Sequence, residues 1–184
     1  MTEPFSESEL AGEVTMRGTG TLLERLRRVR LLAMDVDGVL TDAGMYYTEH
    51  GDELKKFNTR DGQGIALARE LGVRTAILTG ELTDLVIRRA EKLRIDHLKQ
   101  GARDKRAALL EILMAEDLSP EQACYVGDDL NDMGALEIAG LAIVVNDAMR
   151  GPRKLAHYVT AARGGEGAIR EVCELILDAR RGSC

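Results

Sequence analysis

Two aspartates one residue apart, Asp35 and Asp37, directly follow the apolar run Leu31–Met34 and are themselves followed by Gly38. An apolar run that ends in a glycine turn is typical of a strand buried on both faces of a parallel sheet. Such strands place polar groups at their carboxyl ends, where open α/β sheets bind ligands. The first carboxylate and the backbone carbonyl two residues later can share a hard cation, and Mg²⁺ fits best because it keeps water and substrate phosphate among its ligands. An acidic turn without a function would have the same local pattern, so the choice depends on later segments.

The composition limits the kinds of function that the chain can have. Its 184 residues are 45% hydrophobic, which is enough for one domain with a core of its own. The net charge of −6 and the pI near 5.2 argue against binding to nucleic acid, because phosphate backbones attract basic patches. No apolar run approaches the ~20 residues that cross a bilayer, so we expect no membrane partner. Cys124, Cys173 and Cys184 are odd in number and lack metal-ligand spacing, so we expect reduced thiols of a cytoplasmic protein.

Apolar runs alternate with amphipathic segments along most of the chain. Strands are expected at residues 31–34, 73–78, 95–98, 124–126, 141–145 and 157–159. Helical patterns lie between these runs, and the alternation predicts an α/β protein with a Rossmann-like, doubly wound parallel sheet and helices on both faces. We expect a flexible leader over residues 1–20 and a single domain over residues 21–184. Within that domain the patterns indicate a small β-hairpin flap at about 43–58 and a C-terminal helix and tail at about 168–184.

Three of the predicted strand ends carry polar residues in the order Asp-x-Asp, Thr-Gly and Gly-Asp-Asp, with Lys105 between the last two. Each group can serve in phosphoryl transfer, which mainly needs positioning and charge neutralisation. Asp35 is the candidate nucleophile, which would form an aspartyl-phosphate and also ligate the Mg²⁺. Asp37 would act as general acid toward the leaving alkoxide and then as base for the hydrolytic water, while its carbonyl ligates the metal. Lys105 would supply positive charge to the Asp35 carboxylate and to the phosphate.

The remaining strand-end residues would bind the phosphate and complete the metal site. Thr79 and the amide of Gly80 are expected to bind phosphoryl oxygens. Asp128 is expected to complete the metal site, with Asp129 and Asp132 orienting the ligands from behind. Taken singly, a Thr-Gly turn, a surface lysine or aspartates that cap a helix against its dipole would explain these residues. Their joint occurrence, in order and at the ends of separate strands, favours a catalytic site.

This set of residues resembles the haloacid dehalogenase superfamily of phosphatases, whose four motifs match Asp35–Thr41, Thr79-Gly80, Lys105 and Gly127–Asp129. The resemblance narrows to the 3-deoxy-D-manno-octulosonate 8-phosphate phosphatases and their nonulosonate relatives, and it runs from about Leu31 to Leu177. Further matching segments are Lys56–Gly62, Gln100-Gly101 and Gly164–Glu171. The resemblance implies that there is no large cap domain, that the hairpin serves in assembly, and that a homotetramer forms in which neighbouring subunits help to close each site.

The resemblance also implies which residues bind a sugar acid phosphate. Besides Asp37, it assigns this role to Asn58, Thr59, Arg60, Asp61 and Gly62. Arg89 is the matching position for a cation that reaches the substrate carboxylate of an adjacent subunit.

One position departs from the octulosonate pattern. Octulosonate 8-phosphate phosphatases usually have arginine after Thr-Gly, whereas this chain has Glu81 and, eleven residues later, Lys92, as the nonulosonate 9-phosphate branch does. A carboxylate favours hydroxyl donors where a guanidinium favours anionic or acceptor groups. We therefore expect a nine-carbon 2-keto-3-deoxy sugar acid phosphate, with the eight-carbon substrate as the alternative. Glu81 and Lys92 would pair, or both face substrate hydroxyls; a solvated pair on the helix surface is the simpler explanation.

Three other functions fit parts of the pattern. A non-catalytic oligomerisation module, like the C-terminal part of some cytidylyltransferases, would not need every catalytic position to be filled, as they are here. A phospho-receiver domain places its acidic pair and its phosphoacceptor on different strands rather than as Asp-x-Asp on one. A phosphomutase would normally need a cap to shield the phosphoenzyme from water.

Overall fold

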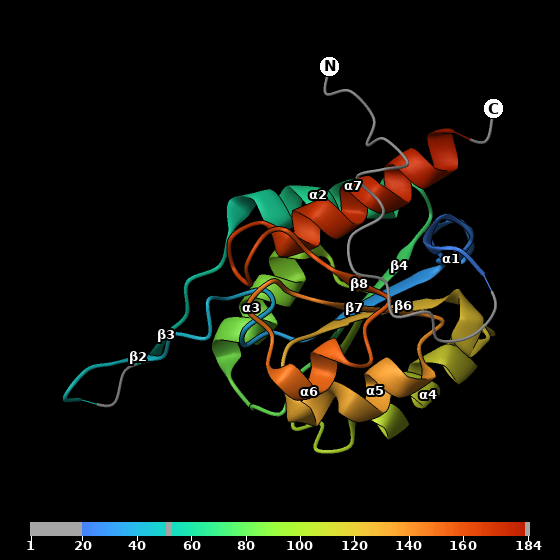
Figure 1. Cartoon of the computed structure of the whole chain (residues 1–184). Helices are drawn as coiled ribbons and strands as arrows, with labels where there is room; N and C mark the ends of the chain where they lie inside the picture. The colour runs from blue at the N-terminus through green and yellow to red at the C-terminus, as the bar shows by residue number, and fades with distance from the viewer. Residues whose placement is uncertain (1–19, 51–52, 183–184) are drawn as a thin grey trace.

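The computed structural model describes residues 20–50 and 53–182, so residues 1–19 of the predicted leader, residues 51–52 of the predicted hairpin and residues 183–184 of the predicted tail lie outside the described residues. Six parallel strands form one sheet in the order β5-β4-β1-β6-β7-β8 (Figure 1). Their bounds are Leu31–Met34 for β1, Arg74–Leu78 for β4, His97–Lys99 for β5, Ala123–Gly127 for β6, Leu141–Val144 for β7 and Tyr158–Val159 for β8. The predicted doubly wound parallel sheet is confirmed, with strand ends shifted by one or two residues.

Helices cover both faces of the sheet (Figure 1). Their bounds are Leu22–Arg28 for α1, Thr59–Glu70 for α2, Asp84–Leu93 for α3, Lys105–Ala115 for α4, Met133–Ile138 for α5, Arg150–Arg153 for α6 and Ala168–Arg181 for α7. Two short 3₁₀ turns, Pro120–Gln122 (η2) and Leu130–Asp132 (η3), flank β6. Helices α1 and α2 pack against α7 on one face, and α4, α5 and α6 pack on the other. No large cap domain interrupts the described part of the chain, as predicted.

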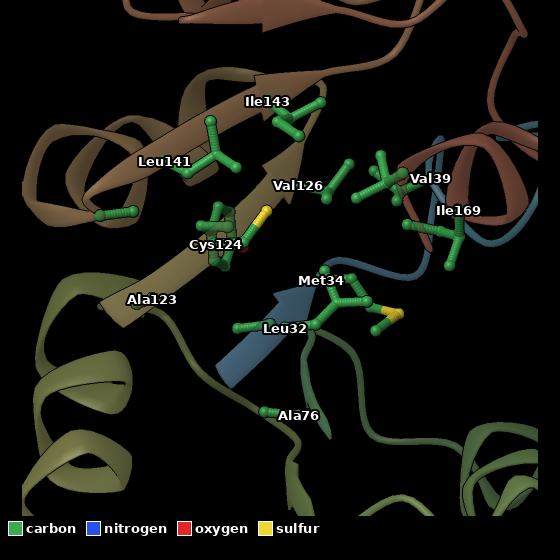
Figure 2. Close-up of a cluster of buried hydrophobic side chains, with 14 of the residues drawn as sticks. Leu32, Met34, Val39, Ala76, Ala123, Cys124, Val126, Leu141, Ile143 and Ile169 are labelled. Atoms are coloured by element: carbon green, nitrogen blue, oxygen red, sulfur yellow. The ribbon is translucent and has the colours of Figure 1, made fainter. Parts of the chain in front are cut away.

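The core lies around the central strand, where every residue of β1 is buried. Figure 2 shows Leu32 and Met34 of β1 beside Val126 of β6, with Ile143 of β7 and Ile169 of α7 completing the cluster. All five side chains are buried. A strand packed on both faces in this way cannot shift without opening voids, because protein interiors are packed as densely as organic crystals. The residue that follows β1 is therefore held in a fixed place.

The order of the strands places a topological switch point between β1 and β6. From β1 the chain moves outward through β4 and β5, and it then returns to the opposite side of β1 to build β6, β7 and β8. Ligands of open α/β sheets bind at such a point, outside the carboxyl ends of the strands. The register pairs Met34 with Val126, and the Asp35 amide donates to the Val126 carbonyl at 3.1 Å. Asp35 and Asp128 consequently leave neighbouring strands at the same edge of the sheet.

A two-stranded antiparallel hairpin, formed by β2 (Tyr46–Tyr47) and β3 (Glu53–Leu54), projects from the domain between β1 and α2 (Figure 1). The predicted hairpin is thus confirmed. Its apolar side chains are largely exposed, with 51% for Tyr46, 67% for Tyr47 and 59% for Leu54. Among the helices that the structure describes, none combines the length and the apolar character needed to cross a membrane.

Candidate active site

Asp35, Lys105 and Asp132 form a buried charged cluster at the switch point. The Lys105 ammonium lies 2.6 Å from Asp35 Oδ2 and 2.7 Å from Asp132 Oδ1, and all three residues are at most 3% exposed. Lys105 is the first residue of α4, and Asp104 caps that helix by accepting a hydrogen bond from the Ala107 amide. Burial lowers the pKa of Lys105, but the two carboxylates outweigh it and raise the pKa above its ordinary value. Lys105 therefore carries a positive charge between two carboxylates.

Asp132 has hydrogen-bond partners on both carboxylate oxygens. Besides Lys105, its Oδ1 accepts from the Tyr125 hydroxyl at 2.6 Å. Its Oδ2 accepts from the backbone amides of Asp128 at 2.8 Å and Asp129 at 3.2 Å. This acceptor pattern fixes the loop that carries Asp128. Asp132 thus lies where a residue that orients the metal ligands is expected, although its position close to Asp35 and Asp128 would also allow it to coordinate.

Asp35 and Asp128 present the donor set for a cation. With Asp132, each offers a carboxylate oxygen, and the three atoms lie within 4.8 Å of one another. Asp128 Oδ1 is buried and has no hydrogen-bond partner among the described residues. Burial, and then the charge of Asp132, raises the pKa of Asp35 to about 7 and that of Asp128 to about 8. Two carboxylates that resist ionisation side by side, one with an orphaned oxygen, fit a hard divalent cation such as Mg²⁺.

Two glycines allow the backbone to pack closely around this site. Gly38 has φ +83°, and a Cβ there would lie 2.1 Å from Asp128 Oδ2, so a side chain would push the carboxylate out of the site. A Cβ on Gly164 would lie 1.8 Å from the Gly38 carbonyl oxygen. The neighbouring Gly165 amide donates to the Val39 carbonyl at 2.9 Å. The glycine-rich loop before α7 therefore braces the loop that carries the two aspartates.

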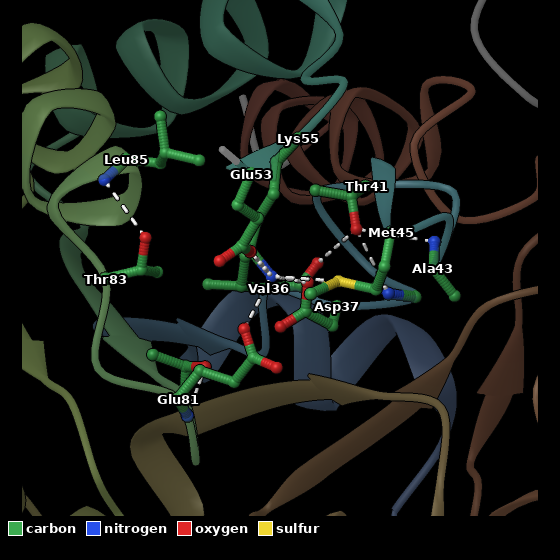
Figure 3. Close-up of polar contacts among 12 residues, drawn as sticks. Val36, Asp37, Thr41, Ala43, Met45, Glu53, Lys55, Glu81, Thr83 and Leu85 are labelled. Carbon is green, nitrogen blue, oxygen red and sulfur yellow. Dashed lines mark hydrogen bonds and ion pairs between the residues drawn. The ribbon is translucent and has the colours of Figure 1, made fainter. Parts of the chain in front are cut away.

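The cluster opens onto a cavity of about 430 Å³. Its lining residues are Asp35, Asp37, Ala43, Thr79, Gly80, Glu81, Asp128, Asp129, Leu130 and Asn131. Thr79 and Gly80 follow β4, so three strand ends meet here as predicted. Figure 3 shows the Asp37 carboxylate and the Glu81 carboxylate on either side of the Lys55 ammonium, at 2.6 Å and 2.7 Å. The arrangement combines a buried carboxylate–ammonium pair, a partly exposed carboxylate and an acidic cavity, which is suited to phosphoryl transfer assisted by a cation.

Comparison with known proteins agrees with this geometry. A haloacid dehalogenase-like hydrolase family matches residues 95–171. The 3-deoxy-D-manno-octulosonate 8-phosphate phosphatase of Yersinia pestis is 45% identical over 156 residues, which are 85% of this chain and 83% of that protein. The enzyme of the same name from Escherichia coli K12 is 44% identical over 156 residues, which are also 85% of this chain and 83% of that protein. The chain belongs to the 3-deoxy-D-manno-octulosonate 8-phosphate phosphatase family.

The fold agrees as well. The 3-deoxy-D-manno-octulosonate 8-phosphate phosphatase of Moraxella catarrhalis is 39% identical and superposes with a TM-score of 0.85 over 87% of this chain and 92% of that one. That enzyme was solved in complex with a magnesium ion, a phosphate ion and 3-deoxy-D-manno-octulosonate. This member of the octulosonate phosphatase family is therefore a phosphatase of the haloacid dehalogenase type. The non-catalytic module and the receiver domain are set aside.

The segment Asn58–Gly62, which the resemblance assigned to substrate binding, does not line the cavity of this phosphatase. Asn58 caps α2 by accepting from the Arg60 amide at 2.9 Å, and it donates to the Gly165 carbonyl at 3.1 Å. Asp61 is fully buried and accepts from the Arg170 amide at the start of α7 at 2.9 Å. Thr59 and Arg60 are exposed. These contacts within one chain link the start of α2 to α7 and to the loop before it. The role of Asn58–Gly62 in substrate binding stays a prediction.

The three charged residues Arg89, Lys92 and Glu81 have different surroundings in the structure. Arg89 donates to the Asn58 carbonyl at 2.8 Å and lies over the Phe57 ring, so its guanidinium is bound within its own chain. Lys92 is exposed near the end of α3 and is not among the lining residues. Glu81 precedes α3, lines the cavity and pairs with Lys55 at 2.7 Å. Of the arrangements considered for Glu81 and Lys92, the direct pair is not among the ion pairs of the described residues.

Lys55 is the residue of the site that sequence reasoning missed. It follows β3 of the hairpin and stands next to Lys56, whose ammonium pairs with Asp42 at 2.7 Å and whose side chain is 57% exposed. The Lys55 side chain is 0% exposed. Side chains of an extended segment alternate between faces, so the doublet itself signals one inward and one outward lysine. Which of the two faces the site depends on the angle at which the hairpin leaves the domain.

Proposed function

We propose that this phosphatase hydrolyses the phosphate monoester of a 2-keto-3-deoxy sugar acid through an aspartyl-phosphate on Asp35, with Mg²⁺ as cofactor. The observation that carries the proposal is the pair of carboxylates at the switch point, Asp35 and Asp128, with Lys105 against Asp35 and an orphaned oxygen on Asp128. The substrate class is supported by the activity named for relatives that are about 44–45% identical.

The residues of the chain divide the reaction between them. Asp35 forms a bond from a carboxylate oxygen to phosphorus as the ester bond to the sugar oxygen breaks, and Asp37 gives its proton to that oxygen. Asp37 then takes a proton from a water molecule that attacks phosphorus, and the bond to Asp35 breaks to release phosphate. Lys105, 2.6 Å from Asp35, balances the charge that collects on the carboxylate and the phosphoryl oxygens.

The cation would be held by the carboxylates of Asp35 and Asp128 and by the Asp37 carbonyl. When bound, Mg²⁺ supplies a charge that neutralises the phosphoryl oxygens and polarises phosphorus. Thr79, which is 1% exposed, and Gly80 also line the cavity, and Thr79 and the Gly80 amide would bind the remaining phosphoryl oxygens.

A nine-carbon substrate is the finer proposal. Glu81 lines the cavity as a carboxylate, and this favours sugar hydroxyl donors over the anionic groups that an arginine would bind. The eight-carbon octulosonate 8-phosphate is the second candidate, because the curated relatives carry that activity in their names. We expect Glu81→Arg to shift the ratio of kcat/KM from the nine-carbon toward the eight-carbon ester. An unchanged ratio would remove Glu81 from the specificity argument.

A phosphate-release assay tests the activity. A panel of 2-keto-3-deoxy sugar acid phosphates with eight and nine carbons, with and without Mg²⁺, should show turnover only with the cation. Asp35→Asn should abolish that turnover while the circular dichroism spectrum stays that of the wild type, because asparagine keeps the shape and loses the nucleophile. Turnover above a few per cent of wild type in Asp35→Asn would exclude Asp35 as the nucleophile.

We also propose that the chain assembles as a homotetramer in which neighbours help to close each site. Tyr46, Tyr47 and Leu54 support this, because they expose apolar surface on a hairpin that projects from the domain. Exposed apolar patches of this kind mark interaction surfaces. Sedimentation equilibrium of the wild type and of Tyr47→Lys tests it: we expect a tetramer for the first and smaller species for the second, and a monomeric wild type would contradict it.

A further inference from the structure

Lys55 is a buried lysine at the base of the hairpin whose ammonium lies between the carboxylates of Asp37 and Glu81, two residues that line the active-site cavity (Figure 3). Its side chain is 0% exposed, and its Nζ lies 2.6 Å from Asp37 Oδ1, 2.7 Å from Glu81 Oε2 and 3.4 Å from Glu53 Oε1. The Met45 sulfur accepts a fourth contact at 3.5 Å. A lysine surrounded in this way loses the rotamer freedom that surface lysines keep, so its position reflects the carboxylates around it.

The surroundings of Lys55 favour its charged form. Burial alone would lower the pKa of this lysine, but hydrogen bonds to Asp37 and then to Glu81 outweigh burial and raise it above its ordinary value. The ammonium has three N–H donors and donates to the Asp37 and Glu81 carboxylates at once. Hydrogen bonds from an ionised donor are shorter and stronger than those between neutral groups.

Asp37 depends on this lysine for its orientation. Over residues 20–50 and 53–182, Lys55 is the one side chain that donates to the Asp37 carboxylate. Asp35, by contrast, is held by the Val36 amide at 2.7 Å as well as by Lys105. The Asp37 side chain is also 29% exposed, so packing alone does not fix it. A proton-transfer group must lie within about 2.6–3.2 Å of its target, and Asp37 would lose that precision without Lys55.

We propose that Lys55 is a positioning residue of the phosphatase reaction, which holds the Asp37 carboxyl group in place for proton transfer to the leaving oxygen. Glu81 and Glu53 hold Lys55 in turn, so the hairpin is joined to the reacting groups through one ammonium. The inference rests on the proposed role of Asp37 as general acid and not on the identity of the sugar acid.

Two small phosphate esters distinguish a loss of Asp37 positioning from a general loss of activity. Phenyl phosphate and p-nitrophenyl phosphate have the same shape near phosphorus, but p-nitrophenolate leaves with little help from an acid, whereas phenolate needs it. In Lys55→Met with Mg²⁺, we expect kcat/KM to fall on the order of 100-fold for phenyl phosphate and less than about 10-fold for p-nitrophenyl phosphate. An equal loss on both esters, or a loss below about threefold on phenyl phosphate, would overturn the proposal.

The neighbouring Lys56 provides a matched control. Lys56→Met removes the same charge from the same segment, where Lys56 pairs with Asp42 and not with Asp37, so both esters should stay within about twofold of wild type. The thermal midpoints of both variants show whether each chain is folded. Because neither ester carries a sugar, an enzyme that rejects every sugar acid phosphate would refute the proposed substrate and leave this test in force.

Chemical rescue gives a second, independent measurement. Lys55→Cys treated with 2-bromoethylamine acquires a thioether side chain of nearly the length of lysine, as the thiolate displaces bromide and restores the ammonium. We expect treatment to recover at least about 10-fold of the loss on phenyl phosphate, while treated wild type keeps its activity. If treated wild type keeps its activity and treated Lys55→Cys stays at the level of Lys55→Met, the ammonium does not position Asp37 and the proposal is wrong.

Discussion

Replacing Asp128 by asparagine tests whether the carboxylates of the site need a bound cation to offset them. Asp128 Oδ1 is buried without a hydrogen-bond partner among the described residues, and its nearest acidic neighbours are Asp132, Asp35 and Asp129. Burial first, and then these charges, raise the pKa of Asp128 to about 8. Asparagine has the same shape and cannot ionise, and its amide can donate to Asp35. We therefore expect Asp128→Asn to stabilise the metal-free enzyme and to abolish the response to Mg²⁺.

The magnitude follows from proton linkage. At about pH 7.5, an unfolded aspartate with the ordinary pKa of 3.8 is ionised, whereas the folded Asp128 largely keeps its proton. The interval of about 3.7 pH units corresponds to roughly 5 kcal/mol of lost stability at about 1.36 kcal/mol per unit. Solvent reaches part of the side chain and Asp35 shares the proton, so screening and coupling reduce the figure to about 2 kcal/mol. For a chain of this length that corresponds to about 4–8 °C in Tm.

The sign of the pH dependence is fixed by the raised pKa. Stability that Asp128 contributes is fully present below about pH 3.8 and is lost as the pH rises toward about 8. The advantage of Asp128→Asn in EDTA should therefore be near zero at about pH 4 and largest at about pH 8. Adding Mg²⁺ should raise the Tm of the wild type, because the cation binds the folded state, and should leave Asp128→Asn unchanged. Thermal unfolding followed by circular dichroism, with and without Mg²⁺, measures each of these differences.

Asp129→Asn is the matched control for this prediction. Asp129 is exposed, is the same residue type and caps η3, a task that asparagine also performs. Its variant should show neither the stabilisation in EDTA nor the loss of the Mg²⁺ response. The reasoning is refuted if Asp128→Asn is no more stable than wild type in EDTA at about pH 7.5, or if Mg²⁺ stabilises it as much as it does the wild type.

Two further substitutions test the supports of the site. Lys105→Met leaves the buried Asp35 and Asp132 side chains without the ammonium between them, so we expect a loss of about 3–5 kcal/mol near neutral pH. The loss should be smaller at about pH 4, because the raised pKa of Asp35 keeps that carboxyl group protonated there. Urea unfolding at the two pH values measures the loss, and an equal loss at both would contradict the charge argument. Gly164→Ala would place a Cβ 1.8 Å from the Gly38 carbonyl oxygen, so the loop that carries the two aspartates would shift. We expect kcat to fall by about 10-fold or more as a result. An unchanged kcat in a steady-state assay would show that the glycine-rich loop does not brace the site.

The local part of the fold could be predicted because each element carries its own signal. The run Leu31–Met34 is apolar throughout and the next residue is an aspartate, so adjacent residues predict both the buried strand and its polar end. The alternation of strands and helices then gives a parallel sheet, and short right-handed connections leave few orders for its strands. This is why the sequence alone predicts Asp35, Thr79 and Asp128 at one edge of the sheet.

The parts that could not be predicted depend on contacts between distant segments. Asp61 accepts from the amide of Arg170, 109 positions later in the chain, and nothing near Asp61 signals that partner. Lys55 reaches Glu81 across 26 positions, and only the angle of the hairpin decides that it, and not Lys56, turns inward. Asp61, but not Lys55, lies in a segment that the family resemblance marks as important. The resemblance cannot tell a helix cap from a substrate ligand, because both need a carboxylate or a donor in a fixed place.

The charges of the site set the order in which its ligands can bind. Five acidic residues line the cavity, namely Asp35, Asp37, Glu81, Asp128 and Asp129, and no basic residue stands among the lining residues that the structure describes. Lys105 and Lys55 offset two of these charges from behind the wall, each between carboxylates. A phosphate dianion that approaches such a surface is repelled until the remaining charge is neutralised. A divalent cation reverses that balance and gives the buried Asp128 Oδ1 a partner, so we expect cation binding to precede substrate binding.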